Sequence, residues 1–76
     1  MQPTAAHVVQ KTLRQAQLYG YVVVRNDRVY HPGGNSPLCS LHLAKEIAQS
    51  GWLRLQGERF EITPEGLKAL AAASTP

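Results

Sequence analysis

The spacing of hydrophobic residues changes near Gly20. Between Thr4 and Tyr19 apolar residues recur every three or four positions, which is the spacing of one face of an α-helix. The centre of this face contains Val9, Leu13 and Ala16. Between Tyr21 and His31 this helical spacing stops, and two short runs rich in Val and Tyr, YVVVR and RVYH, favour β-strands. The pattern therefore predicts a helix that ends at Gly20 and two strands after it.

The two strands are predicted to form a hairpin around Asn26-Asp27, residue types that suit a two-residue turn. This turn places Val24 opposite Val29 on one face. The other face then contains Tyr21, Val23, Arg25, Arg28 and Tyr30. Arg25 lies opposite Arg28 there, and like charges directly opposite each other are destabilising. An anionic partner would relieve this repulsion.

A second helix is predicted after the loop PGGNSP at residues 32–37. Ser36 can cap this helix, Pro37 suits its first turn, and Gly51 is a suitable end. The buried arc of the helix is predicted to contain Leu41, Leu43, Ala44, Ile47 and Ala48. The opposite arc contains His42, Lys45, Glu46 and Gln49. The helical spacing of about 100° per residue separates the two arcs.

Apolar and polar residues alternate from Trp52 to Thr63 and predict a second hairpin, with its turn at Gln56-Gly57 and Leu55 opposite Glu58. The core face of this hairpin contains Leu53, Leu55, Phe60 and Ile62. In this register Arg54 and Arg59 lie side by side on the outer face.

The run RFEITPEGLKAL, Arg59 to Leu70, predicts an abrupt change from strand to helix. Thr63 can cap the helix with its hydroxyl, and Pro64 suits the first helical position. Glu65 adds a negative charge at the positive end of the helix dipole. The last helix is predicted to run from Pro64 to about Ala72.

The composition of the chain fits one small domain. Its 76 residues are 43% hydrophobic, so one core is expected, with flexible ends at residues 1–3 and 73–76. The net charge of +3 favours anionic partners such as nucleic acid. Cys39 is the single cysteine, which fits a reducing compartment. The sequence contains neither an apolar run of membrane-spanning length nor a signal-peptide pattern, so a cytoplasmic protein without a membrane partner is expected.

The segment LHLAKEIAQSGWLRLQGERFEITPEGLKAL resembles the second half of a winged helix-turn-helix domain. The residues that fit this run are Leu43, Ile47, Gly51, Trp52, Leu53, Phe60, Ile62, Thr63 and Gly66. The resemblance implies an α+β, winged-helix-like single domain over residues 1–76, with the order helix, hairpin, helix, hairpin (the wing), helix.

The first half departs from the winged-helix pattern, because a hairpin and PGGNSP stand where a short helix is usual. This arrangement resembles a group of very small bacterial winged-helix proteins. One of them is a toxin that inhibits a DNA topoisomerase, and it is similar at Cys39-Ser40-Leu41 and from Phe60 to Gly66.

Two surfaces are candidate binding sites. The first is a surface for double-stranded DNA. In it the helix side chains His42, Lys45 and Gln49 reach base edges or phosphates, and Arg54 and Arg59 hold phosphates. A transcriptional regulator that acts as a homodimer or in a larger complex is the function that this surface predicts.

The second candidate surface is the outer face of the first hairpin, with Tyr21, Arg25, Arg28 and Tyr30. Tyr and Arg are enriched at protein-binding hot spots. The alternative function is therefore a protein-interaction module on the same scaffold, of the kind found in toxins or phage inhibitors.

Metal binding and catalysis have little support in the sequence. Cys39 and His42 lie three residues apart, with His31 upstream, but a zinc site usually has a denser Cys and His pattern. Gly33-Gly34 lacks the Lys of a phosphate-binding loop. No metal, cofactor or enzymatic activity is predicted.

Overall fold

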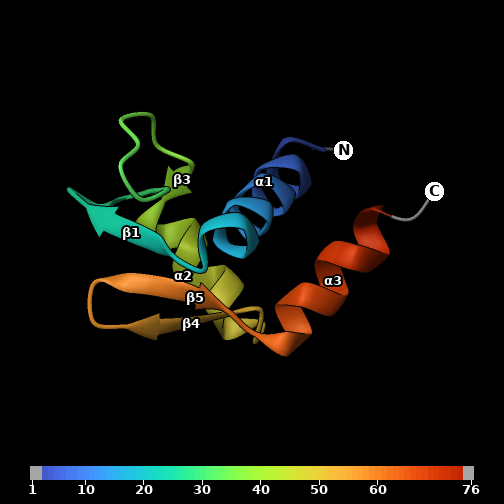
Figure 1. The fold of residues 1–76 in the computed structure, drawn as a ribbon. Helices are drawn as coiled ribbons and strands as arrows, with labels where there is room; N and C mark the ends of the chain where they lie inside the picture. Colours follow the sequence, from blue (N-terminus) through green and yellow to red (C-terminus); the bar gives the residue numbers. More distant parts are fainter. Residues whose placement is uncertain (1–2, 75–76) are drawn as a thin grey trace.

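A computed structural model describes residues 3–74 of the chain, and the side chains of residues 7–72 (Figure 1). Its helices are α1 (Pro3–Tyr19), α2 (Leu41–Gln49) and α3 (Pro64–Ser74). Its strands are β1 (Val22–Arg25), β2 (Arg28–Tyr30), β3 (Cys39–Ser40), β4 (Leu53–Gln56) and β5 (Arg59–Ile62). Within the described residues the three helices and five antiparallel strands form one small α+β domain. The α+β class and the three helices were predicted, whereas only four of the five strands were.

The two predicted hairpins join into a single sheet with the strand order β3-β2-β1-β5-β4. The junction is the antiparallel pairing of β1 with β5, in which Val22 lies opposite Phe60 and Val23 opposite Arg59. The Val24 N–H extends this contact by donating to the Glu58 carbonyl at 2.9 Å. The sheet therefore presents one continuous surface on each side, which the separate hairpin patterns did not predict.

One side of the sheet, the inner face, packs against α1 and α2 around a single core. The fully buried strand side chains include Val22, Val29 and Phe60. The other core members are Leu13, Ala16, Leu38, Ala44, Ile47, Leu53 and Leu70. α3 packs mainly on α1, at the end of the sheet away from the hairpin turns (Figure 1). All three helices are thus clear of the opposite, outer side of the sheet.

The first hairpin has the predicted register. Val24 lies opposite Val29 and Arg25 opposite Arg28. Asn26 and Asp27 occupy the turn with positive φ angles of 51° and 65°. Asn and Asp tolerate this left-handed conformation better than most residues do, which explains why the turn forms here.

The start of the second helix was predicted wrongly at Ser36-Pro37. α2 begins at Leu41, and Ser40 is its cap, with its side chain accepting from the Leu43 N–H at 3.1 Å. The intervening Cys39–Ser40 pairs with β2 as a short third strand. Both Ser36 and Ser40 have the chemistry of a cap, so the strand pairing decided between them. The predicted buried and exposed arcs of α2 are confirmed.

The second hairpin was predicted with a register two residues out of place. Leu55 lies opposite Phe60, and Gln56 opposite Arg59, so the turn is Gly57-Glu58. Gly57 has a φ of 64°, which glycine adopts at no steric cost. A shift of two residues keeps every side chain on its face, so Arg54 and Arg59 are still outside. They are not direct cross-strand partners, however, because Arg54 lies opposite Glu61.

The change from strand to helix at Thr63 forms as predicted. The Thr63 hydroxyl oxygen accepts from the Gly66 N–H at 3.0 Å and donates to the Gly51 carbonyl. Gly66 is buried against Trp52, and a Cβ at this position would overlap the Trp52 carbonyl oxygen and come within 2.8 Å of Ile62 Cγ1. The glycine in TPEG therefore permits a close approach between α3 and the chain before β4.

The first and last helices extend further toward the chain ends than predicted. α1 includes Pro3 and α3 continues to Ser74, whereas residues 1–2 and 75–76 of the predicted flexible ends lie outside the described residues. No helix within residues 3–74 combines the length and the apolar character needed to cross a membrane.

Candidate functional site

The outer face of the sheet brings together residues from both predicted binding surfaces. Alternation along each strand and the pairing of β1 with β5 place them on the side away from the helices. We define the outer face by Tyr21, Val23, Arg25, Arg28, Tyr30, Arg54, Gln56, Arg59 and Glu61. It contains four of the eight Lys and Arg residues of the chain. The arginines of the second hairpin and the tyrosines of the first hairpin thus belong to one surface.

Two arginines of the outer face stack on tyrosines. The Arg25 guanidinium lies 4.1 Å from the centre of the Tyr30 ring, and the Arg59 guanidinium lies 4.7 Å from that of Tyr21. Both distances are within the range of a cation–π interaction. Val23 is half-buried and lies opposite Tyr30 on one side and Arg59 on the other. The centre of the face is therefore a layer of planar groups around an apolar position.

Glu61 is the one carboxylate of the outer face. It lies 3.5 Å from Arg54 and 3.8 Å from Arg59. The arginine side chains are 67% and 50% exposed, so water screens both ion pairs and each contributes little to stability. The two guanidinium groups thus remain accessible to a further anion.

A loop borders the outer face beside Arg25. The Arg25 side chain donates to the Gly34 carbonyl at 2.5 Å. Gly34 is buried so close to the His31 ring that a Cβ would overlap it, and that ring stacks on Tyr19 with 5.0 Å between centroids and an angle of 10°. The loop is therefore tied both to the sheet and to the end of α1.

The loop and the sheet border an open, shallow hollow of about 860 Å³. The hollow is lined by Val23 and Arg25 of β1, by Tyr21 directly before β1, and by Arg59 of β5. The remaining lining residues are Val24, Gly33, Gly34, Asn35, Gln56 and Glu58. This hollow combines two guanidinium groups, an aromatic ring and two side-chain amides with one acidic residue, Glu58. The two guanidinium groups outnumber the one carboxylate, so the hollow can bind a planar anionic ligand.

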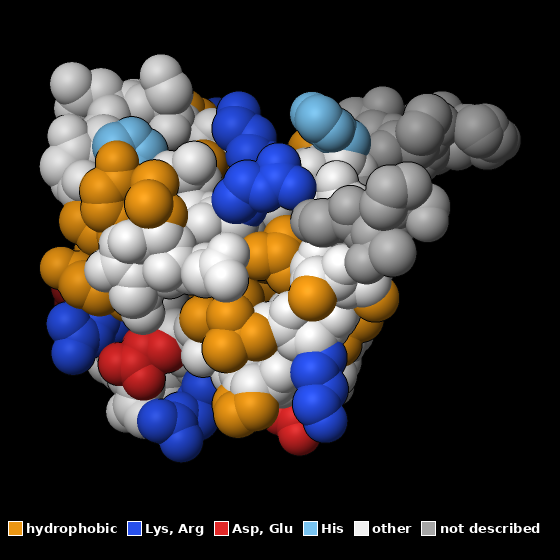
Figure 2. Space-filling model, turned by 45° about the vertical axis from the view of Figure 1, so that its right-hand side comes forward, with side chains coloured by type: hydrophobic (Ala, Val, Ile, Leu, Met, Phe, Trp, Pro, Cys, Tyr) orange, Lys and Arg blue, Asp and Glu red, His pale blue; other side chains and the backbone are white. Residues whose placement is uncertain are grey.

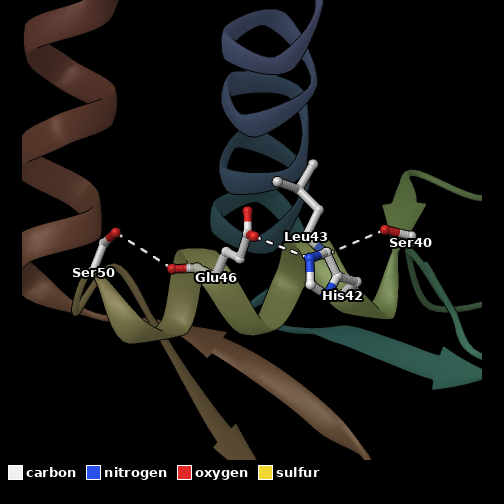
Figure 3. Close-up of polar contacts among 5 residues, drawn as sticks. All are labelled: Ser40, His42, Leu43, Glu46 and Ser50. Carbon is white, nitrogen blue, oxygen red and sulfur yellow. Dashed lines mark hydrogen bonds and ion pairs between the residues drawn. The ribbon is translucent and has the colours of Figure 1, made fainter.

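The polar arc of α2 lies away from this hollow. His42 is paired with Glu46 one turn later, at 3.0 Å, and both side chains are exposed (Figure 3). Lys45 and Gln49 are also exposed. Lys45 borders a separate hollow together with the inward-facing Val24 and Leu55. The three predicted DNA contacts of α2 are thus on the helix side of the sheet, and Arg54 and Arg59 are on the other side.

α1 carries a second group of basic side chains. His7, Lys11 and Arg14 follow one another at helical spacing and line a hollow of about 300 Å³ with Gln10 and Gln15. Figure 2 shows Lys and Arg side chains gathered beside a His on the upper part of the molecule. This group lacks the aromatic residues of the outer face.

Cys39 is half-buried in β3, where it lies opposite Val29 of β2 and directly precedes Ser40, the cap of α2. Burial raises the pKa of its thiol above the ordinary value, and the hydrogen bond with Thr12 lowers it by a smaller amount. Among the described residues no group of three or more His, Cys, Asp or Glu side chains is placed to hold a metal ion.

Comparisons with protein-family models, with curated proteins and with solved structures gave no match. The winged-helix resemblance therefore remains a prediction made from residues 41–70.

Sequence analysis did not identify the residues that complete the outer face. Glu61 was missed because the predicted register of the second hairpin placed Arg59, and not Glu61, opposite Arg54. Gly34 and Asn35 were assigned to a plain loop, and no local pattern indicated that Arg25 binds this loop. Gln56 was assigned to the turn. The only sequence feature that could have indicated a role for Gln56 was its position beside the turn glycine, Gly57.

Proposed function

We propose that the protein binds nucleic acid through the outer face of its sheet. One observation carries this proposal: the pairing of β1 with β5 gathers Arg25, Arg28, Arg54 and Arg59 on one face with a single carboxylate among them. Nucleic acids carry closely spaced phosphates, and neutralising them releases bound counterions, which favours association.

The arginine chemistry of the face supports the proposal. A guanidinium group can donate two parallel hydrogen bonds to a phosphate and can also stack on a base. Arg25 and Arg59 are held by tyrosine rings, so they lose less side-chain freedom on binding than free arginines do. Arg28 and Arg54 flank them and are exposed.

A winged-helix regulator that binds duplex DNA is the finer function that the sequence predicts. In it α2 enters a major groove and His42, Lys45 and Gln49 contact bases. The five-stranded sheet differs from a typical winged helix-turn-helix domain, and α2 and the wing arginines lie on opposite sides of it. We therefore assign the main interface to the outer face and not to α2.

Titration of labelled oligonucleotides, single-stranded and duplex, tests the proposal. We expect binding near 50 mM salt that weakens as salt rises. The double variant R28Q/R54Q should bind more weakly and should reduce the salt slope by up to about 0.7–0.9 per lost phosphate contact. The control R14Q/K68Q removes the same charge from α1 and α3 and should change binding much less. Absence of binding to every oligonucleotide by a folded sample would refute the proposal.

A protein-interaction module is the second candidate function. The half-buried Val23 between Tyr21 and Tyr30 gives the face an apolar centre as well as arginines, which is the composition of a protein-binding hot spot. Under this alternative, oligonucleotides do not bind. Tyr30→Ala and Arg25→Ala should then abolish binding of the protein partner, and Arg28→Gln should have little effect on that binding.

A further inference from the structure

We infer that the outer face takes single-stranded nucleic acid, with an unpaired base in the hollow beside the Gly33–Asn35 loop. This inference rests on the proposed nucleic-acid function and names the form of nucleic acid that the site fits. It depends on the shape of the hollow, on the stacked arginines and on the polar groups around them.

The shape of the site favours a single strand. Duplex DNA exposes its bases only in its grooves, which proteins usually enter with a helix or a two-stranded ribbon. Here the floor of the hollow is the side-chain layer of a sheet, and Gly33, Gly34 and Asn35 form a wall beside it. A base can reach this floor only if it is free to leave a stack. Single strands supply such bases without a cost of unpairing.

The planar groups of the floor match the face of a base. The Arg25 guanidinium stacks on the Tyr30 ring, and the Arg59 guanidinium stacks on the Tyr21 ring. The two stacked pairs lie on either side of Val23. Unpaired bases stack on aromatic rings and on guanidinium planes, whatever their sequence. The hollow of about 860 Å³ is within the ordinary size range of ligand sites.

Apart from Glu58, the remaining polar groups divide between base edges and phosphates. Asn35 and Gln56 line the hollow and can donate to or accept from a base edge. Arg28 on β2 and Arg54 on β4 lie outside it. They are three strand spacings apart across the sheet and four residues apart along the strands, which is about 20 Å on the diagonal. A strand that crosses the sheet diagonally with one base in the hollow can therefore bring a phosphate to a cation at each end of the site.

The charge-conserving variants R25K and R59K separate stacking from charge. A lysine keeps the positive charge but lacks the plane on which a base stacks. In anisotropy titrations with labelled dT12 at fixed salt, we expect each variant to bind at least about fivefold more weakly, since stacking on one side chain supports a factor of this size or larger. Arg14→Lys on α1 is the matched control and should not change the affinity. Thermal melts of each variant confirm that it is folded.

A duplex of twelve base pairs, titrated in the same buffer, completes the test. We expect dT12 to bind at least about tenfold more tightly than the duplex, and the variants R25K and R59K to bind the duplex as the unmodified protein does. If the duplex binds as tightly as dT12, or if the lysine variants keep full affinity for dT12, the inference is wrong although the protein still binds nucleic acid. Binding to neither oligonucleotide would refute the proposed function itself.

Discussion

Val22 lies directly opposite Phe60 where β1 pairs with β5, and both side chains are fully buried. This pair joins two hairpins that are far apart in the sequence, and it fixes which side chains share the outer face. The stability of the domain and the composition of the candidate site therefore depend on the same contact.

Removing the Phe60 ring should destabilise the domain strongly. We expect Phe60→Ala to lower the free energy of unfolding by about 3–5 kcal/mol and Leu53→Ala by about 2–5 kcal/mol, because both leave cavities in the core. Urea denaturation measures the change. Leu18→Ala is the control, since Leu18 is 68% exposed, and it should change stability by less than about 0.5 kcal/mol. A Phe60→Ala protein as stable as this control would contradict the pairing of β1 with β5.

The hydroxyl of Thr63 should stabilise the start of α3. It accepts from the Gly66 N–H and donates to the Gly51 carbonyl, so Thr63→Ala removes both bonds. We expect a loss of about 1 kcal/mol, together with faster amide exchange from Glu65 to Leu70. Thr63→Ser keeps the hydroxyl and should retain most of the stability. Equal exchange rates in the two variants would show that the hydroxyl does not cap α3.

Local chemistry predicted the turns and caps that involve neighbours in the sequence. The Asn26-Asp27 turn and the Thr63 cap each depend on residues within a few positions, and both formed as predicted. The predicted start of α2 was wrong because Ser36 and Ser40 are equivalent as caps. Only the pairing of Cys39 with Val29 distinguishes them.

Contacts between distant segments could not be predicted from these patterns. The alternation in β1 and β5 shows which side chains share a face, but it does not show that the two strands are neighbours. That pairing places the arginines of the second hairpin beside the tyrosines of the first hairpin. The candidate residues Arg25, Arg28, Arg54 and Arg59 were therefore found from the sequence, whereas their arrangement as one surface required the structure.

Gly66→Ala should destabilise the protein although alanine favours helices. Helix propensity alone would add about 1 kcal/mol to stability at this position. The new Cβ would overlap the Trp52 carbonyl oxygen, which belongs to the backbone and cannot rotate away. We expect a net loss of about 1–3 kcal/mol, as is usual for overpacking. Lys68→Ala in the same helix is the control and should be close to neutral. A Gly66→Ala protein more stable than the unmodified one would show that α3 does not approach Trp52 closely.

The turn of the first hairpin should prefer glycine to alanine at position 27. Asp27 has a φ of 65°, a conformation that costs an ordinary L-residue about 1–2 kcal/mol. We expect Asp27→Gly to be more stable than Asp27→Ala by about this amount in thermal melts. Both variants keep the backbone carbonyl that accepts from the Leu41 N–H, so they differ only in the cost of the turn. Equal stabilities would indicate a different turn.

The Cys39 thiol should react slowly in the folded protein. Burial raises its pKa above the ordinary value of 9.0, so less of the reactive thiolate is present near pH 8 than in the unfolded chain. We expect iodoacetamide to modify Cys39 at least about tenfold more slowly in buffer than in urea at the same pH. Because the folded pKa is the higher one, the neutral thiol contributes stability that is fully present below about pH 9 and is lost as the pH rises through the folded pKa. Cys39→Ala lacks this group, so its stability should fall less between pH 8 and pH 10 than that of the unmodified protein. Equal modification rates in buffer and in urea would place Cys39 at the surface and would contradict its contact with Thr12.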